Sequence, residues 1–174
     1  VAGDVYAIYY NREGALNVFL GDASGHGVAA AFLTMMVHIG LHQQRADLPP
    51  STILERLNAN LNAHNLSDMF VTGTYVRIDP NGNCVVAHAG HPSLLVRRAA
   101  TREVISFQET GVPLGMFGVG IARVRLRIVA PAWLWVAAGE ASAVSDSLGL
   151  RIRLADLLQP LDADADDFEG DAAG

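Results

Sequence analysis

Apolar residues fall in short runs along this chain, and glycine, proline or charged residues separate the runs. Residues 15–21 are apolar and β-prone and stop at Gly21-Asp22, which predicts a buried strand that ends at a glycine-rich turn. Helical spacing follows from Val28 to about Gln44. We expect the buried face of this helix to carry an apolar stripe made of Val28, Phe32, Met35, Met36 and Ile39.

A second helix and a series of strands complete the pattern. Ser51 and Thr52, with Glu55 three residues after Thr52, form a capping-box pattern for a helix that ends near His64. From Met69 the spacing is typical of strands, and a turn at residues 80–83 that contains Asn-Gly predicts a hairpin. Further strands are expected at SLLVRR, REVISF, ARVRLRIV and WLWVAA, and a short helix at 154–158. This order of elements predicts an α+β layered domain.

Composition and charge narrow the class of protein. The 174 residues, 51% hydrophobic and 17% charged, suffice for one well-buried domain, which we place at residues 1–160, followed by an acidic tail at 161–174. The net charge is −6 and the basic residues are scattered, so we expect no nucleic-acid partner. No apolar run approaches the ~20 residues of a membrane helix, so we expect no membrane span. The single cysteine, Cys84, fits a reducing cytoplasm.

Two aspartates are candidates for chemistry, because Asp4 and Asp22 each stand beside glycine at the start or end of a β-like segment. Carboxylates at strand ends suit a hard cation such as Mg²⁺ or Mn²⁺, which prefers oxygen ligands. Spacing alone favours a simpler interpretation, in which Asp22 caps the helix that begins near Gly27 and Asp4 closes a turn. The glycine-rich stretch lacks the Lys-Ser/Thr ending of a nucleotide-binding loop, which excludes that class.

Histidines suggest two other sites. His38 and His42 stand four residues apart and share one face of the expected helix. A zinc pair is conceivable, but the sequence offers no obvious third ligand, so we interpret both as surface or core histidines. Ser24 and His26 stand in one turn, where neighbouring residues rarely face each other as nucleophile and base, so we do not predict such a pair.

Several motifs in sequence order carry a family resemblance. AGDVY from Ala2 and GDASGHGVAAA from Gly21 closely resemble the opening motifs of PPM-type metal-dependent protein serine/threonine phosphatases, in the bacterial branch of SpoIIE- and RsbU-like regulators. Further matches are Asn-x-x-Leu at 58–61, MFVTGT from Met69, AGHP from Ala89 and GVPLG from Gly111. Together the matches span most of the chain, from residue 1 to about residue 140.

The resemblance implies an αββα sandwich, in which two antiparallel sheets pack together and helices flank them. It implies a site for two Mg²⁺ or Mn²⁺ ions, held by Asp4, by Asp22 as a bridging ligand and by the backbone carbonyl of Ala23. A metal-bound water would attack the phosphorus directly, so no catalytic side chain is expected beyond that water. The implied substrate is a phosphoprotein of the anti-sigma-factor-antagonist type in the bacterial cytoplasm, with a receiver or sensor domain upstream.

The chain departs from the family pattern in its later acidic motifs. LWVAAGE from Leu134 places Ala138 where the family has a metal-binding aspartate, and Ala7 replaces another aspartate. No apolar strand follows the acidic pair at 166–167, and the family's first strand and last strands have no counterpart in the chain. We therefore expect one cation or none. The alternative function is a pseudophosphatase that acts as a protein-binding signalling module, and a truncated or engineered inactive enzyme is a third interpretation.

Overall fold

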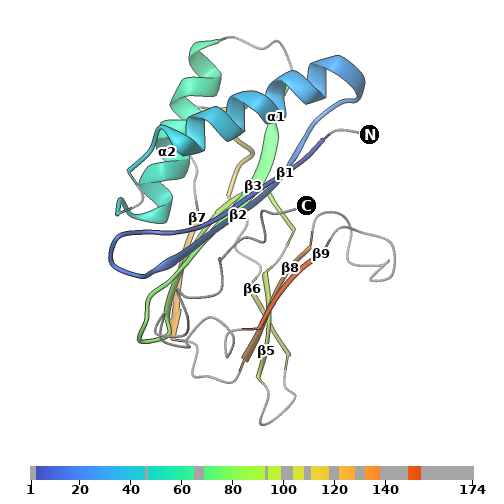
Figure 1. Ribbon diagram of the computed structural model, residues 1–174. Helices are drawn as coiled ribbons and strands as arrows, with labels where there is room; N and C mark the ends of the chain where they lie inside the picture. Colours follow the sequence, from blue (N-terminus) through green and yellow to red (C-terminus); the bar gives the residue numbers. More distant parts are fainter. Residues whose placement is uncertain are drawn as a thin grey trace, which may run out of the picture.

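The strands form two antiparallel sheets in the computed structural model (Figure 1), which describes residues 3–45, 47–64, 69–92, 94–98, 104–107, 111–117, 122–127, 132–137 and 149–153. The five-stranded sheet has the order β1 (Asp4–Tyr10), β2 (Leu16–Ala23), β3 (Val71–Ile78), β4 (Asn83–Ala89) and β7 (Ala122–Arg127). The four-stranded sheet has the order β6 (Val104–Phe107), β5 (Leu94–Arg98), β8 (Ala132–Ala137) and β9 (Gly149–Arg153).

Two helices, α1 (Gly27–His42) and α2 (Pro50–Ala63), cover one face of the five-stranded sheet, and the second sheet lies on its other side (Figure 1). The main core cluster lies between the helices and the sheet, with Phe19 and Tyr75 as its largest side chains. The α+β prediction is confirmed, and the described residues contain one helical layer and both sheets of the expected sandwich. Within those residues, no helix is long and apolar enough to cross a membrane.

The predicted buried face of α1 is wrong. Val28 is 88% exposed, and Phe32, Met35 and Ile39 are exposed as well; only Met36 packs against the core. The buried face instead carries Ala30, Leu33, Val37, Gly40 and Leu41. Because α1 is apolar on all sides, its periodicity does not select a face, and small residues decide where the helix can approach its neighbours. A Cβ at Gly40 would lie 2.6 Å from Leu57 Cδ1 of α2, so the two helices meet closely there.

The start of α2 also differs from the prediction. The helix begins at Pro50, with Pro49 as its N-cap residue and no side-chain cap hydrogen bond, so the capping box at Thr52 and Glu55 is wrong. Proline suits the first helical turn, because its φ angle is already helical and its missing N–H would have had no partner there. Ser51 is buried within the first turn.

The predicted β-strands are confirmed. The β3–β4 hairpin turns at Gly82, which has a φ of +80°, and the Asp79 carboxylate accepts hydrogen bonds from the backbone N–H groups of Asn81 and Asn83 at 2.9 and 2.8 Å. Strands β5 to β8 fall on the four predicted stretches, whereas β9 was not predicted. The expected helix at 154–158 and the acidic tail at 161–174 lie outside the described residues.

Residues 111–117 connect several of the motifs to one another. Leu114 and Val71 exchange two backbone hydrogen bonds of 2.8 and 2.9 Å. The buried Asn58 of α2 accepts a hydrogen bond from the Gly115 N–H at 2.7 Å and donates one to the Phe117 carbonyl oxygen, also at 2.7 Å. These bonds attach α2 and residues 111–117 to the start of β3, next to the end of the sheet that carries Asp22.

Candidate metal centre

Asp4 and Asp22 lie together at one end of the five-stranded sheet. They are direct partners in the β1–β2 register, and opposite residues of antiparallel strands project from the same face. Thr72 of β3 is the partner of Asp22 on its other side. A row of three oxygen-bearing side chains therefore crosses three strands, and both carboxylates in it are exposed.

A glycine beside this row leaves room for its oxygens. The Ala23 N–H donates a 2.9 Å hydrogen bond to the Gly3 carbonyl oxygen. A Cβ at Gly3 would lie 2.6 Å from Asp22 Oδ1 and 2.9 Å from the Ala23 carbonyl oxygen. Any larger residue at position 3 would displace one of these oxygens. The Asp22 carboxylate and the Ala23 carbonyl, both named from the sequence as candidate ligands, thus border the same space.

The electrostatics of the pair favour a cation. Asp22 is exposed as a residue, but its carboxyl group is partly desolvated by its neighbours. This partial desolvation, followed by the like charge of Asp4, raises the pKa of Asp22 above its ordinary value. A divalent cation would relieve this repulsion, and two carboxylates with a backbone carbonyl form a hard oxygen donor set of the kind that Mg²⁺ and Mn²⁺ prefer. The residues present therefore fit such an ion.

The simpler interpretation of the two aspartates is wrong. Helix α1 has His26 as its N-cap residue and no side-chain cap hydrogen bond, so Asp22 does not cap it. Asp4 is the first residue of β1, paired along the strand, and it does not close a turn. Neither carboxylate has the local structural role that spacing alone suggested.

Two residues near Asp22 were not predicted as part of the site. The Thr72 hydroxyl lies 3.0 Å from His91 Nδ1 and 3.4 Å from the Asp22 carbonyl oxygen, to which it donates. His91 is 1% exposed and follows Gly90, which forms a parallel bridge with Gly73 of β3. Thr72 and His91 both belong to motifs that carry the family resemblance. Membership in these motifs was the sequence signal that could have placed them near the site.

Ser24 has a structural role in the loop after β2. Its hydroxyl accepts a 2.9 Å hydrogen bond from the Phe70 N–H, and its own N–H donates to the Phe70 carbonyl oxygen at 2.8 Å. These bonds join the loop to the residue before β3. The Ser24 hydroxyl is therefore bonded to the backbone of Phe70.

The described residues supply only part of a two-ion centre. Within them, no group of three or more histidine, cysteine, aspartate or glutamate side chains could hold a metal ion. Asp4 and Asp22 provide two carboxylates, which suits one ion that keeps several of its waters. Ala138, the position where the family's aspartate is absent, lies outside the described residues, as does the acidic pair at 166–167.

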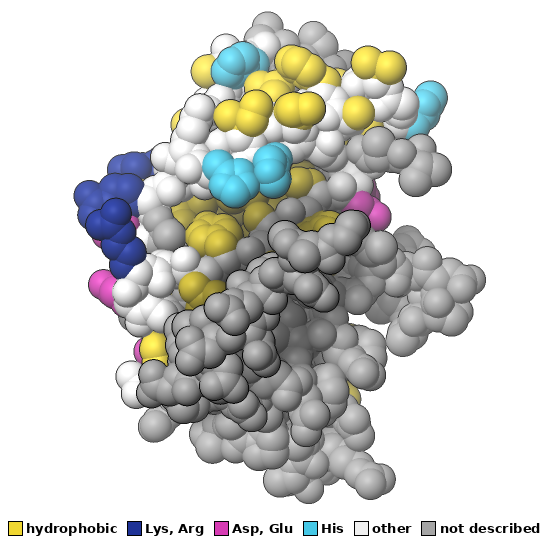
Figure 2. Space-filling model, viewed as in Figure 1, with side chains coloured by type: hydrophobic (Ala, Val, Ile, Leu, Met, Phe, Trp, Pro, Cys, Tyr) yellow, Lys and Arg dark blue, Asp and Glu magenta, His cyan; other side chains and the backbone are white. Residues whose placement is uncertain are grey.

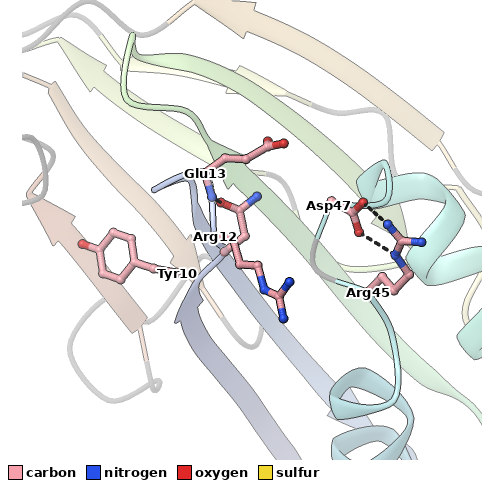
Figure 3. A pocket seen from close by; sticks show the side chains of 6 residues that line it. Tyr10, Arg12, Glu13, Arg45 and Asp47 are labelled. Atoms are coloured by element: carbon pink, nitrogen blue, oxygen red, sulfur yellow. Dashed lines mark hydrogen bonds and ion pairs between the residues drawn. The ribbon is translucent and has the colours of Figure 1, made fainter.

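A hollow of about 490 Å³ lies at the other end of the β1–β2 hairpin (Figure 3) and is lined by Tyr10, Asn11, Arg12, Glu13, Arg45 and Asp47. The Arg45 guanidinium donates to the Asp47 carboxylate at 2.7 and 3.1 Å and lowers the pKa of Asp47. Strand β1 separates the hollow from Asp4 by roughly 20 Å, at about 3.4 Å per residue. This hollow is therefore not part of the carboxylate site.

Comparison with known proteins identifies the family. The sequence profile described as stage II sporulation protein E (SpoIIE) matches residues 12–132. This chain belongs to the SpoIIE family. Asp22, Ala23, Thr72 and His91 lie inside the matched residues of this SpoIIE-family chain, and Asp4 precedes them. The resemblance drawn from the motifs is thereby confirmed.

Individual relatives of the SpoIIE-family chain agree with this assignment. It is 27% identical over 124 residues to phosphoserine phosphatase RsbP of Bacillus subtilis (strain 168), a match that covers 67% of the chain and 30% of RsbP. The RsbU and RsbW domains of Rv1364c from Mycobacterium tuberculosis superpose with a TM-score of 0.70 at 23% identity, over 79% of this chain and 39% of that one. RsbX in complex with magnesium gives a TM-score of 0.67 at 12% identity, over 79% and 66% of the two chains. The two structures show the shared fold.

Proposed function

We propose that this domain is a bacterial regulatory protein serine/threonine phosphatase, which hydrolyses a phosphate ester on a protein of the anti-sigma-factor-antagonist type. The observation that carries the proposal is the pair of facing carboxylates, Asp4 and Asp22, next to the Ala23 carbonyl oxygen. The names of the relatives support it, since RsbP is a phosphoserine phosphatase. The magnesium bound to RsbX supports a divalent cation in this fold.

Each residue of the proposed site has a distinct task. Asp4, Asp22 and the Ala23 carbonyl would hold one Mg²⁺ or Mn²⁺ ion, which lowers the pKa of a bound water and neutralises charge on phosphoryl oxygens. Thr72 holds the backbone at Asp22 through its hydroxyl, and His91 holds Thr72 in turn. No side-chain nucleophile is needed in this scheme, because the ion held by these residues would supply an activated water as the nucleophile.

The setting of the domain forms part of the proposal. The chain spans 30% of the length of RsbP. On the strength of the motif resemblance alone, we propose that an upstream receiver or sensor domain controls it. We place the protein in the bacterial cytoplasm, where Cys84 would stay reduced. Cys84 is free and buried, and burial raises the pKa of its thiol to about 12, which keeps it unreactive.

A second candidate function is a pseudophosphatase that binds a protein partner without hydrolysis. Two observations favour it: the described residues hold no cluster of three or more potential metal-ligating side chains, and alanine stands at position 138. With so few carboxylates, little offsets the free energy of removing water from Mg²⁺. Such a module would keep the fold and its docking surface and lack turnover.

Hydrolysis of p-nitrophenyl phosphate in excess Mn²⁺ tests the two candidates. Asp22→Asn should lower turnover more than about tenfold, because it removes a charged ligand. Asp47→Asn is the matched control, since Asp47 is an exposed carboxylate paired with Arg45, away from the site. A Mn²⁺-dependent rise in melting temperature, lost in Asp22→Asn and kept in Asp47→Asn, gives an independent measure of cation binding.

The outcomes separate the candidates. Turnover that depends on Asp22 and not on Asp47 supports the phosphatase. Mn²⁺ binding without turnover, together with turnover gained by Ala138→Asp, supports the pseudophosphatase. An equal Mn²⁺-dependent rise in melting temperature in the wild type and in Asp22→Asn overturns the proposed metal site.

A further inference from the structure

A pair of histidines on α1 has the geometry of a metal chelate. Nε2 of His38 lies 3.1 Å from Nε2 of His42, one helical turn later, and the two ring centroids are 4.4 Å apart. The nitrogens therefore converge although the rings are tilted by 70° to each other. Two imidazole nitrogens bound tetrahedrally at about 2.0–2.1 Å from Zn²⁺ are separated by about 3.3 Å, close to the observed spacing.

The pair is accessible and held on a rigid support. Both histidines are exposed, and Figure 2 shows histidine and apolar side chains on the outer surface of the helical layer. The opposite face of the same turn is packed, because Val37 is fully buried and Leu41 is 2% exposed. The backbone that carries both imidazoles is therefore fixed before any ion binds, so little conformational entropy is lost on binding.

The chemistry of this face selects the type of ion. Helix α1, GVAAAFLTMMVHIGLH, contains no carboxylate, so a hard cation such as Mg²⁺ finds no charged oxygen on it. Neutral imidazole is a preferred ligand of zinc, nickel and copper. The ligands at this position are thus nitrogens, whereas Asp4, Asp22 and the Ala23 carbonyl are all oxygen donors.

The geometry points to a second metal site, at which His38 and His42 chelate one late transition-metal ion of the Zn²⁺ type. It lies about 16 Å along α1 from Gly27, the first residue of the helix, since His38 follows Gly27 by eleven residues at about 1.5 Å each. The remaining coordination positions take water or a ligand from another molecule. One Nε2 donates a hydrogen bond to the other. Ion binding would replace this hydrogen bond, and the donor ring would carry its proton on Nδ1 instead, so that both Nε2 lone pairs face the ion.

Isothermal titration of the full chain with ZnCl₂ in excess Mg²⁺ tests this site, because the excess Mg²⁺ would compete with Zn²⁺ for the oxygen ligands at Asp4 and Asp22 and has little affinity for imidazole. His38→Ala and His42→Ala should each weaken Zn²⁺ binding by about tenfold or more, since either change turns a chelate into a single ligand. His64→Ala is the matched control, because His64 is an exposed histidine at the end of α2 and should not affect the affinity.

Nuclear magnetic resonance of the histidine side chains identifies directly which imidazoles bind the ion. The imidazole signals of His38 and His42 should shift together on addition of Zn²⁺, and those of His64 should not. Unchanged affinity in either single variant, or an equal loss in His64→Ala, overturns the proposal. Circular dichroism checks that each variant keeps its helices, and the shift experiment on the wild-type chain tests the site without any substitution.

Discussion

The imidazole of His88 should make the stability of this domain strongly dependent on pH. His88 lies on β4 with no exposed surface, and its Nδ1 is 2.9 Å from the Thr74 hydroxyl. Among the described residues, its Nε2 has no hydrogen-bond partner. A charged ring at this position would lose its hydration without a compensating bond. Burial accordingly lowers the pKa of His88 from 6.5 to about 4.

The direction and size of the effect follow from the two pKa values. Below about pH 6.5 the unfolded chain binds a proton at His88 that the folded chain does not accept, so stability is present above this pH and is lost as the pH falls. The full shift from 6.5 to about 4 corresponds to about 3 kcal/mol, at about 1.4 kcal/mol per pKa unit. Roughly 2 kcal/mol of this should be lost by about pH 5.

Urea unfolding over a series of pH values measures this loss. His88→Gln removes the titrating group. As the pH falls, the free energy of unfolding of this variant should therefore decrease less steeply than that of the wild type. Between about pH 4 and 6.5, the difference between the two slopes should correspond to close to one bound proton. His26→Gln replaces an exposed histidine and should keep the wild-type slope. Parallel curves for the wild type and His88→Gln would refute the reasoning. Titration of the His88 ring by magnetic resonance gives the same test on the wild-type protein.

Two further predictions concern the packing that supports the carboxylate site. Gly73→Ala should lower the free energy of unfolding by about 1–3 kcal/mol, because the new Cβ would lie 2.8 Å from the ring of the fully buried Phe19. In urea unfolding, Phe19→Leu should lower the free energy of unfolding by less in the Gly73→Ala background than in the wild type, because the smaller side chain relieves the clash. Equal losses in the two backgrounds would contradict the clash. Asn58→Ala should lower the free energy of unfolding by about 2–3 kcal/mol through the loss of its two bonds to residues 111–117. Asn60→Ala on the same helix takes no part in these bonds and is the control, and equal losses in the two variants would contradict this role.

Most elements could be predicted from the chain because their signals are local. The turn at 80–83 depends on Asn81-Gly82 and a nearby aspartate, and the structure has the hairpin where it was expected. The motifs also identified the family, since their order and spacing are properties of the sequence. The prediction of a capping box at Thr52 was wrong for a local reason too. The helix begins at Pro50, two residues before Thr52, so Thr52 does not stand at the N-cap position.

Contacts between distant residues could not be predicted in this way. The periodicity of α1 permits several apolar faces, and the close contact of Gly40 with Leu57 selects the one that is buried. Thr72 and His91 stand 19 residues apart, and they meet only because the sheet brings the end of β4 beside β3.

The amino-acid sequence alone identifies the SpoIIE-type motifs, the order of helices and strands, and Asp4 and Asp22 as candidate ligands, because each depends on residue types at short spacings. Tertiary structure decides that the two aspartates face each other, that most of the predicted apolar stripe of α1 is exposed, and that two histidine nitrogens converge to 3.1 Å. These outcomes depend on strand register, on the shapes of packed neighbours and on side-chain rotamers. Such properties arise only when segments far apart in the chain are brought into contact.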